Sequence, residues 1–194
     1  IGDGVALQSS LGWTGSATSA RLATRRAPDS ATAHEIGVEL TTITPDATFR
    51  MALQQGSDLP EVIDLLRIDA VADLTAPLDR HVQTTAPRLA KLTLREGLLR
   101  WGDLVISAAG DVVPNADGQA EGRIDIRVEQ WRHLVPVLVA AGLITADAAP
   151  TVTRALELLV QQGDDPSVLT LPLAFQQGRM SLGPLPLGPA PFLN

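Results

Sequence analysis

Apolar residues recur at every second position along much of this chain, and this period of two constrains the fold more than any other feature. The longest example covers residues 66–76. Its apolar positions are Leu66, Ile68, Ala70, Ala72, Leu74 and Ala76. Such alternation is typical of a strand with one face in contact with the core. Extended, this segment measures ~40 Å, about twice the usual strand, so we expect it to bend across a curved sheet.

A series of shorter alternating segments follows between residues 92 and 129. Their apolar positions are Leu92, Leu94, Leu99, Trp101, Leu104, Ile106, Ala108, Ile124, Ile126 and Val128. We expect a turn at Glu96–Gly97, a bulge or bend at Gly102–Asp103, and a tight turn at 114–118. Sequential strands joined by such turns predict an antiparallel meander.

The period changes from two to 3.6 after the meander, which indicates helices. One stripe, Leu134, Val135, Leu138 and Val139, ends at Gly142 and tolerates Pro136 only if that residue lies in the first turns. A second helix is expected from Thr145 to Gln162, with Gly163 as its stop. Its apolar stripe is Val152, Leu156, Leu159 and Val160. The predicted fold class is α+β: a curved antiparallel β-sheet with two C-terminal helices packed on it.

The chain of 194 residues fits a single domain, 1–194, in which 61–194 carries the curved sheet and helices. Residues 1–60 are weakly patterned. The expected elements are a strand from Val5, a loop over 12–19, strands at 20–24 and 36–40, either a helix or a strand at 48–55, and a short helix at 79–85. After the helices we expect a strand over 169–175 and an extended Pro-rich tail over 183–191.

Charge and composition exclude several classes of protein. The net charge is −7 and the only basic cluster is Arg21, Arg25 and Arg26, so we do not expect nucleic-acid binding. The absence of cysteine excludes disulfides and thiolate metal sites. The longest apolar run, 134–144, is too short to span a bilayer. The chain does not begin with Met, so we expect further residues upstream of Ile1, where any export signal or membrane anchor would lie.

No motif in the sequence predicts catalysis, a cofactor or a metal. His34, His81 and His133 lie on different predicted elements, as surface or capping residues. A calcium loop around Asn115 to Gly118 fails because Val113 and Ile124 occupy positions that need carboxylates. The carboxylates Asp164 and Asp165 read as a solvated loop, and Asp69 and Asp73 are ~13 Å apart on one strand face. Trp101 and Trp131 are expected to pack in the core, while Trp13 lies in a loop.

The C-terminal two thirds resemble a known family. The segments that carry the resemblance are Gly97 to Gly102, Gly110-Asp111, Gly118 to Gly122, Trp131 to Leu134, Ala140 to Ile144, Leu171 to Leu173, Gly178 to Met180 and Leu182 to Pro191. In these segments the chain resembles the domain of unknown function 2125, found mainly in alphaproteobacteria. More loosely, its ending resembles AsmA-like envelope proteins, whose curved sheets hold an apolar groove for lipid. The resemblance implies an exported protein and supplies no catalytic residues.

Two functions remain open at this point. In the first, the chain is a non-enzymatic periplasmic envelope protein that binds lipid or another hydrophobic molecule on its curved sheet. The expected ligand-binding residues are Leu66, Ile68, Ala70, Ala72 and Leu74. In the second, it is an interaction module that binds another envelope protein through a sheet edge or the Pro-rich tail. Membrane attachment is expected only through an upstream segment. The alternative to an open groove is that the two C-terminal helices cover the apolar face of this strand.

Overall fold

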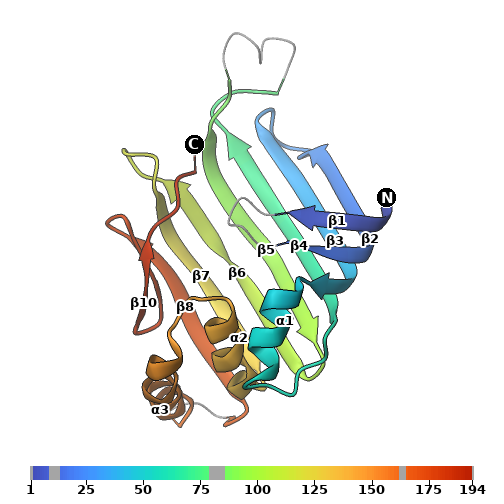
Figure 1. Cartoon of the computed structure of the whole chain (residues 1–194). Coiled ribbons are helices and arrows are strands. Elements are labelled where there is room, and N and C mark those ends of the chain that lie inside the picture. Colours follow the sequence, from blue (N-terminus) through green and yellow to red (C-terminus); the bar gives the residue numbers. More distant parts are fainter. Residues whose placement is uncertain (1, 9–13, 79–85, 162–164, 194) are drawn as a thin grey trace.

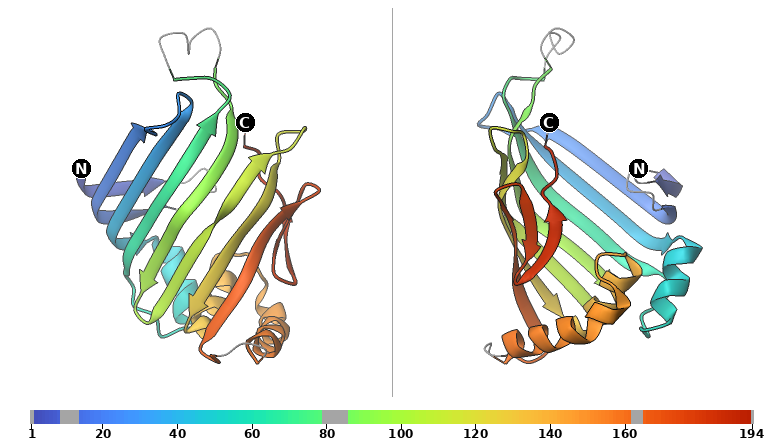
Figure 2. Two further views of the ribbon diagram at one scale, coloured as in Figure 1. Left: turned by 180° about the vertical axis from the view of Figure 1, so that it is seen from behind. Right: turned by 60° about the vertical axis from the view of Figure 1, so that its left-hand side comes forward.

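The fold is built around one antiparallel sheet of ten strands, which lie side by side in the order of the sequence (Figure 1). The computed structural model describes residues 2–8, 14–78, 86–161 and 165–193. The strands are β1 (Gly2–Gln8), β2 (Thr14–Arg26), β3 (Ala33–Pro45), β4 (Ile63–Leu74), β5 (Leu89–Trp101), β6 (Leu104–Pro114), β7 (Ala120–Glu129), β8 (Val168–Gln176), β9 (Arg179–Leu182) and β10 (Leu185–Pro189). The helices are α1 (Ala47–Gln54), α2 (Leu134–Ala140) and α3 (Ala149–Val160), with 3₁₀ turns at Trp131–His133 and Ala146–Ala148. The sheet is curved and the helices lie at one end of it, so the predicted fold class is confirmed (Figure 2).

The expected meander is confirmed, because β5, β6 and β7 pair antiparallel in sequence. The turn expected at Glu96–Gly97 is wrong. β5 continues through these residues as a bulge, and the chain reverses at Gly102–Asp103 instead. The apolar positions change here from even to odd numbers, and one extra residue, Arg95, keeps Leu94 and Leu99 on the same face. A change of parity marks a bulge as readily as a turn.

The N-terminal region forms more strand than its sequence predicts. The loop expected over 12–19 is wrong from Thr14 onward, where β2 pairs with β1 on one side and β3 on the other. Hydrogen bonds to two neighbouring strands outweigh the weak strand propensity of Gly and Ser here. The open choice at 48–55 resolves as α1, whose first turn is capped by the Asp46 carboxylate, 2.9 Å from the backbone nitrogen of Phe49.

The C-terminal helices lie where the change of period predicts. α2 begins at Leu134, so Pro136 lies in the first turn, where its missing N–H leaves no hydrogen bond unmade. The left-handed Gly142 follows the end of α2. α3 begins at Ala149 rather than at Thr145, because a 3₁₀ turn occupies the preceding residues. Within the described ranges, no helix combines the length and apolarity that crossing a bilayer requires.

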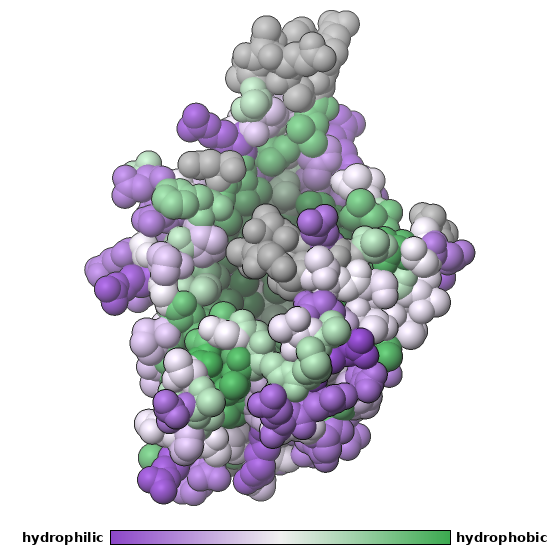
Figure 3. Space-filling view, in the orientation of Figure 1, coloured by the Kyte–Doolittle hydropathy of each residue, from purple (hydrophilic) through white to green (hydrophobic). Residues whose placement is uncertain are grey.

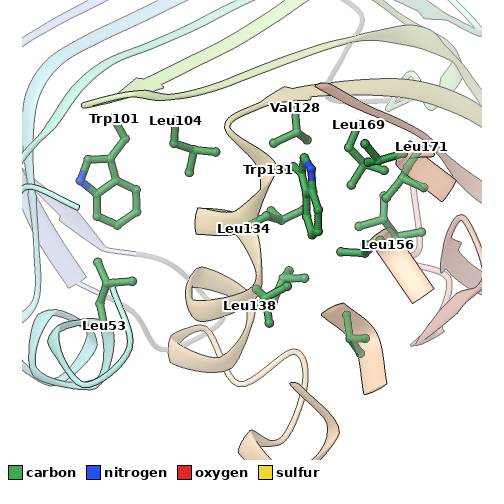
Figure 4. Close-up of a cluster of buried hydrophobic side chains, with 14 residues drawn as sticks. Leu53, Trp101, Leu104, Val128, Trp131, Leu134, Leu138, Leu156, Leu169 and Leu171 are labelled. Carbon is green, nitrogen blue, oxygen red and sulfur yellow. The ribbon is translucent and has the colours of Figure 1, made fainter. Parts of the chain in front are cut away.

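The main core lies between the helices and the adjoining ends of β5 to β9 (Figure 4). Its most deeply buried side chains are Trp131, Leu104, Leu156, Leu169 and Val128. Trp101 and Trp131 both belong to this cluster, which confirms their expected packing role. Each indole nitrogen donates a hydrogen bond to a proline carbonyl, of Pro60 and Pro166 respectively, so neither buried N–H is unpaired.

The Pro-rich tail is extended, as expected, and forms the edge strand β10. An edge position suits its prolines, since a strand there needs hydrogen bonds on one side only. A second, smaller cluster of Val112, Ala120, Phe175 and Ala190 joins this part of the chain to the upper ends of β6 to β8. The expected helix over 79–85, Trp13, His81, Gly163 and Asp164 lie outside the described residues.

Candidate functional site

The two faces of the sheet differ in chemistry, and the strand register assigns each residue to one of them. Residues directly opposite one another in an antiparallel pair lie on the same face. One such row across β2 to β5 is Leu22, Val38, Ile68 and Gly97, and the next row is Thr24, Ile36, Ala70 and Leu94. These rows share a face with Trp101 and Leu104, which the helices cover. We call this the inner face and the opposite side the outer face.

The outer face carries a lattice of ion pairs. Glu39 of β3 pairs with Arg21 of β2 at 3.4 Å and with Arg67 of β4 at 2.9 Å. Glu35 likewise contacts both Arg25 and Arg95. Each carboxylate is thus held between arginines of flanking strands. The ion-paired side chains of these strands therefore lie on the outer face, and the apolar side chains lie on the inner face.

The lowered pKa of Glu35 shows that this lattice favours the carboxylate. Hydrogen bonds from Arg25, and then from Arg95, lower the pKa of Glu35 below its ordinary value of 4.5. Asp111 on β6 has a lowered pKa for a similar reason, since Thr93 and Lys91 of β5 both bond to it. The charges of the outer face are therefore structural partners of one another, and no reaction chemistry follows from them.

Part of the inner face lies beyond both hydrophobic clusters. Its residues come from the parts of β3, β4 and β5 that lie outside the contact with the helices. We call the surface that they form the trough. It comprises Ile36, Val38, Leu40, Leu66, Ile68, Ala70, Ala72, Leu92 and Leu94. Figure 3 shows apolar side chains lining a hollow above the helices, with hydrophilic side chains along its left edge.

The five residues predicted as ligand-binding lie together in this region. Leu66, Ile68, Ala70 and Ala72 follow one another along the inner face of β4, and Leu74 continues at the upper end, after a register shift against β5. Ala70 and Ala72 are 5% and 8% exposed, while the other three are half-buried. None of the five belongs to either hydrophobic cluster, and Ile63 is the described β4 residue that packs against the main cluster. The helices thus pack beside this stretch of β4, on its neighbours.

Ala70 has a smaller side chain than the residues on either side of it in its row. It lies between Ile36 of β3 and Leu94 of β5 in the register. A methyl group between two branched side chains leaves a depression above it, which explains its burial without a covering helix. The next two strands continue the floor with Gly97 and Ala108, which are themselves direct partners.

A further polar feature lies apart from the trough. A polar depression of about 330 Å³ lies at the lower end, between Asp103, Arg127, Glu129 and Asp165. Hydrogen bonds from the Ser167 hydroxyl and backbone N–H lower the pKa of Asp165, so that carboxylate serves the turn before β8. In the ranges that the structure describes, no three His, Asp or Glu side chains are grouped to hold a metal ion.

Two polar residues of the inner face were missed by sequence reasoning. His34, expected at the surface or as a cap, is half-buried on the inner face, opposite Ala72. Arg26 is opposite His34 on β2 and so shares that face. Alternation in 20–26 and 34–40 already assigns both to the apolar side, which was the available signal. His133 is instead near Asp58, with 3.3 Å between Nδ1 and the carboxylate oxygen.

Comparison with known proteins identifies a family. The family described as "Uncharacterized protein conserved in bacteria (DUF2125)" matches residues 2–191, nearly the whole chain. No curated protein and no solved structure matches.

Proposed function

We propose that this chain, which belongs to the DUF2125 family of uncharacterized bacterial proteins, binds an acyl chain in the trough of its inner face. The observation that carries the proposal is the position of Leu66, Ile68 and Ala70, which face inward yet lie outside both hydrophobic clusters. Contiguous apolar surface of this kind is uncommon in a protein without a partner for it. A long aliphatic chain is the ligand whose chemistry matches a purely aliphatic lining.

The dimensions support this proposal. Along β4 the trough runs from Leu66 to Ala72, or ~20 Å at ~3.3 Å per residue. A single leaflet of a bilayer contains chains that extend over ~15 Å, half of the hydrocarbon thickness. The trough can therefore cover such a chain along its length, and each methylene removed from water contributes about 0.8 kcal/mol.

The role that we propose is carriage or sequestration rather than catalysis. The nine trough residues are Ile, Val, Leu and Ala, which offer no nucleophile, general acid or general base. Binding here requires only that water be excluded from the chain, and the curvature of the sheet supplies walls for that. The ion-paired outer face keeps the opposite surface compatible with water.

The proposal includes the bacterial periplasm as the place of action, with anchoring to the inner membrane through a segment outside this sequence. Its support is the chemistry of the ligand, since acyl chains that leave a membrane need an apolar enclosure. Fractionation of cells that express the epitope-tagged full-length protein tests it. Release of the protein with periplasmic markers, or its retention with inner-membrane markers facing the periplasm, supports this location, and a cytosolic distribution contradicts it.

A second candidate function is binding of another protein along a sheet edge. β1 is the terminal strand of the sheet at the N-terminal end, and among the described strands only β2 pairs with it, so its other side could accept an added strand. The Pro-rich tail is a poorer candidate for this role, since β10, the terminal strand at the other end of the sheet, contains Pro186 and Pro189, which have no backbone N–H to donate.

The direct experiment is native mass spectrometry of the protein purified from its own host, combined with titration of a fluorescent long-chain fatty acid. Retained lipid, or micromolar binding that saturates at one chain per protein, supports the proposed function. No retained lipid and no binding at micromolar concentration contradict it and favour the edge-binding alternative. The same fluorophore without the long acyl chain is the control for binding of the dye itself.

A further inference from the structure

The polar residues Arg26 and His34 meet at one end of the trough. Along β2, the inward positions are Ala20, Leu22, Thr24 and Arg26, so polarity rises toward the upper end of the strand. Arg26 is directly opposite His34, and His34 is directly opposite Ala72 of the trough. Residues paired in this way have Cβ atoms roughly 4.5–5.5 Å apart, close enough for both side chains to contact one small group.

Arg26 differs from the other arginines of its strand, because it has no acidic partner among the described residues. Arg21 and Arg25 face outward and pair with Glu39 and Glu35. No described residue forms an ion pair or side-chain hydrogen bond with Arg26, and Asp29 in the following turn is likewise unpaired with it. An arginine opposite a histidine, without a carboxylate between them, is an arrangement that a bound anion stabilises.

His34 provides an independent observation at the same place. Its Nε2 is one of the two buried side-chain nitrogens that lack a hydrogen-bond partner within the described residues. A buried polar atom without a partner destabilises the fold, and such atoms are few in native proteins. An anionic oxygen between Arg26 and His34 would supply the missing partner.

We infer that the ligand of the trough is an anionic single-chain amphiphile, whose headgroup lies against Arg26 and His34 and whose tail runs down the trough toward the helices. This inference rests on the proposed function, because it assigns the ligand class and its orientation. The opposite orientation would place a charged headgroup among the aliphatic side chains of Leu40, Leu66 and Leu99, next to the main cluster, which is an unfavourable environment for a charge. A carboxylate or a phosphate monoester both satisfy the chemistry of the headgroup site.

The test compares hexadecanoate, hexadecanol and butyrate by calorimetry on wild-type protein and two variants, Arg26→Ala and Arg25→Ala. Arg25 is the matched control, since it is the adjacent arginine on the other face and pairs with Glu35. We expect wild-type protein to bind hexadecanoate about tenfold more tightly than hexadecanol, the size of one charge-assisted hydrogen bond. Arg26→Ala should remove that preference without weakening hexadecanol, and Arg25→Ala should retain it.

The outcomes separate this inference from the function on which it rests. Equal binding of hexadecanoate and hexadecanol, unchanged in Arg26→Ala, overturns the headgroup site but leaves the trough. Binding of butyrate as tightly as hexadecanoate overturns the amphiphile in favour of a free-anion site. No binding of either long chain contradicts the proposed function itself. Circular dichroism of each variant confirms that it is folded.

Orientation has its own readout in tryptophan quenching. Trp101 and Trp131 lie in the main cluster, at the end of the inner face where the tail should reach. In a Trp13→Phe background, a fatty acid brominated near its tail should quench their fluorescence more than one brominated near its carboxylate. The reverse order overturns the proposed orientation.

Discussion

The indole nitrogen of Trp101 donates a hydrogen bond to the carbonyl oxygen of Pro60 across 2.6 Å, which joins the lower end of β5 to the loop before β4. The adjacent Gly102 strengthens the same junction, since its backbone N–H donates to the Asp64 carboxylate at 2.8 Å. These two hydrogen bonds connect β4, which carries the trough, to the main hydrophobic cluster. The stability of the site and of the core are connected through this contact.

Replacing Trp101 should show both parts of its role. Trp101→Ala removes a fully buried indole from the main cluster and should lower the free energy of unfolding by ~3–5 kcal/mol. Trp101→Phe keeps much of the apolar contact but leaves the Pro60 carbonyl without its donor, and should cost ~1–3 kcal/mol. Urea denaturation measures both, and a loss of unfolding free energy below about 1 kcal/mol for Trp101→Ala contradicts the deep burial.

Leu156→Ala, in α3, should lower the free energy of unfolding by ~2–5 kcal/mol because of the cavity that it leaves.

Filling the trough should block binding while sparing the fold. Ala70→Trp places a large side chain above β4, between Ile36 and Leu94, where neither hydrophobic cluster extends. We expect loss of fatty-acid binding and a free energy of unfolding within about 1 kcal/mol of wild type. Val71→Trp, on the outer face of the same strand, is the matched control and should bind normally. A destabilisation of Ala70→Trp by ~1–3 kcal/mol or more would mean that the position is packed like a core.

Close strand contact should make Gly122 sensitive to a methyl group. Gly122 has φ +139°, and a Cβ there would lie 2.3 Å from the backbone oxygen of Asp111. Gly122→Ala should therefore destabilise the protein by about 1–3 kcal/mol, through strain and a shift of β6 against β7. Gly37→Ala is the control, because its nearest neighbours are 4.0 Å away, and thermal melts should show little change or a small gain. Equal effects of the two changes would disprove this account.

Acid should weaken the outer lattice through Glu35. The pKa of Glu35 is lowered from 4.5 by its hydrogen bonds to Arg25 and Arg95, so the contribution of Glu35 to folding stability is fully present above pH 4.5. That contribution is lost as the pH falls through the lowered pKa, where the native carboxylate finally binds a proton. A carboxyl NMR titration should show the lowered pKa, and the double variant Arg25→Ala/Arg95→Ala should raise it toward 4.5. An unchanged titration in the double variant would rule out these partners as the cause.

The local patterns in the sequence were sufficient to predict most of the elements that frame the site. Alternation over 66–76 predicted that Leu66, Ile68, Ala70 and Ala72 share one face, and the pairing of β4 with β3 and β5 confirms it. The stripe of Val152, Leu156 and Val160 predicted the buried side of α3. These features depend on the periods of a strand and a helix, which are properties of neighbouring residues along one chain.

Other features required the tertiary structure because they depend on partners far apart in sequence. The parity change at Arg95 and Glu96 is compatible with a turn or a bulge, and only pairing with β4 and β6 made it a bulge. Thr14 to Ser19 became strand because β1 and β3 flank them. Likewise, the period-two alternation predicted that Arg26 and His34 lie on the inner face, but only the strand register showed that they lie opposite each other at the end of the trough. Sequence by itself determined which side chains point inward, and the packing of the helices on β5 to β9 decided which of them belong to the main cluster, since burial depends on the elements that pack against a face.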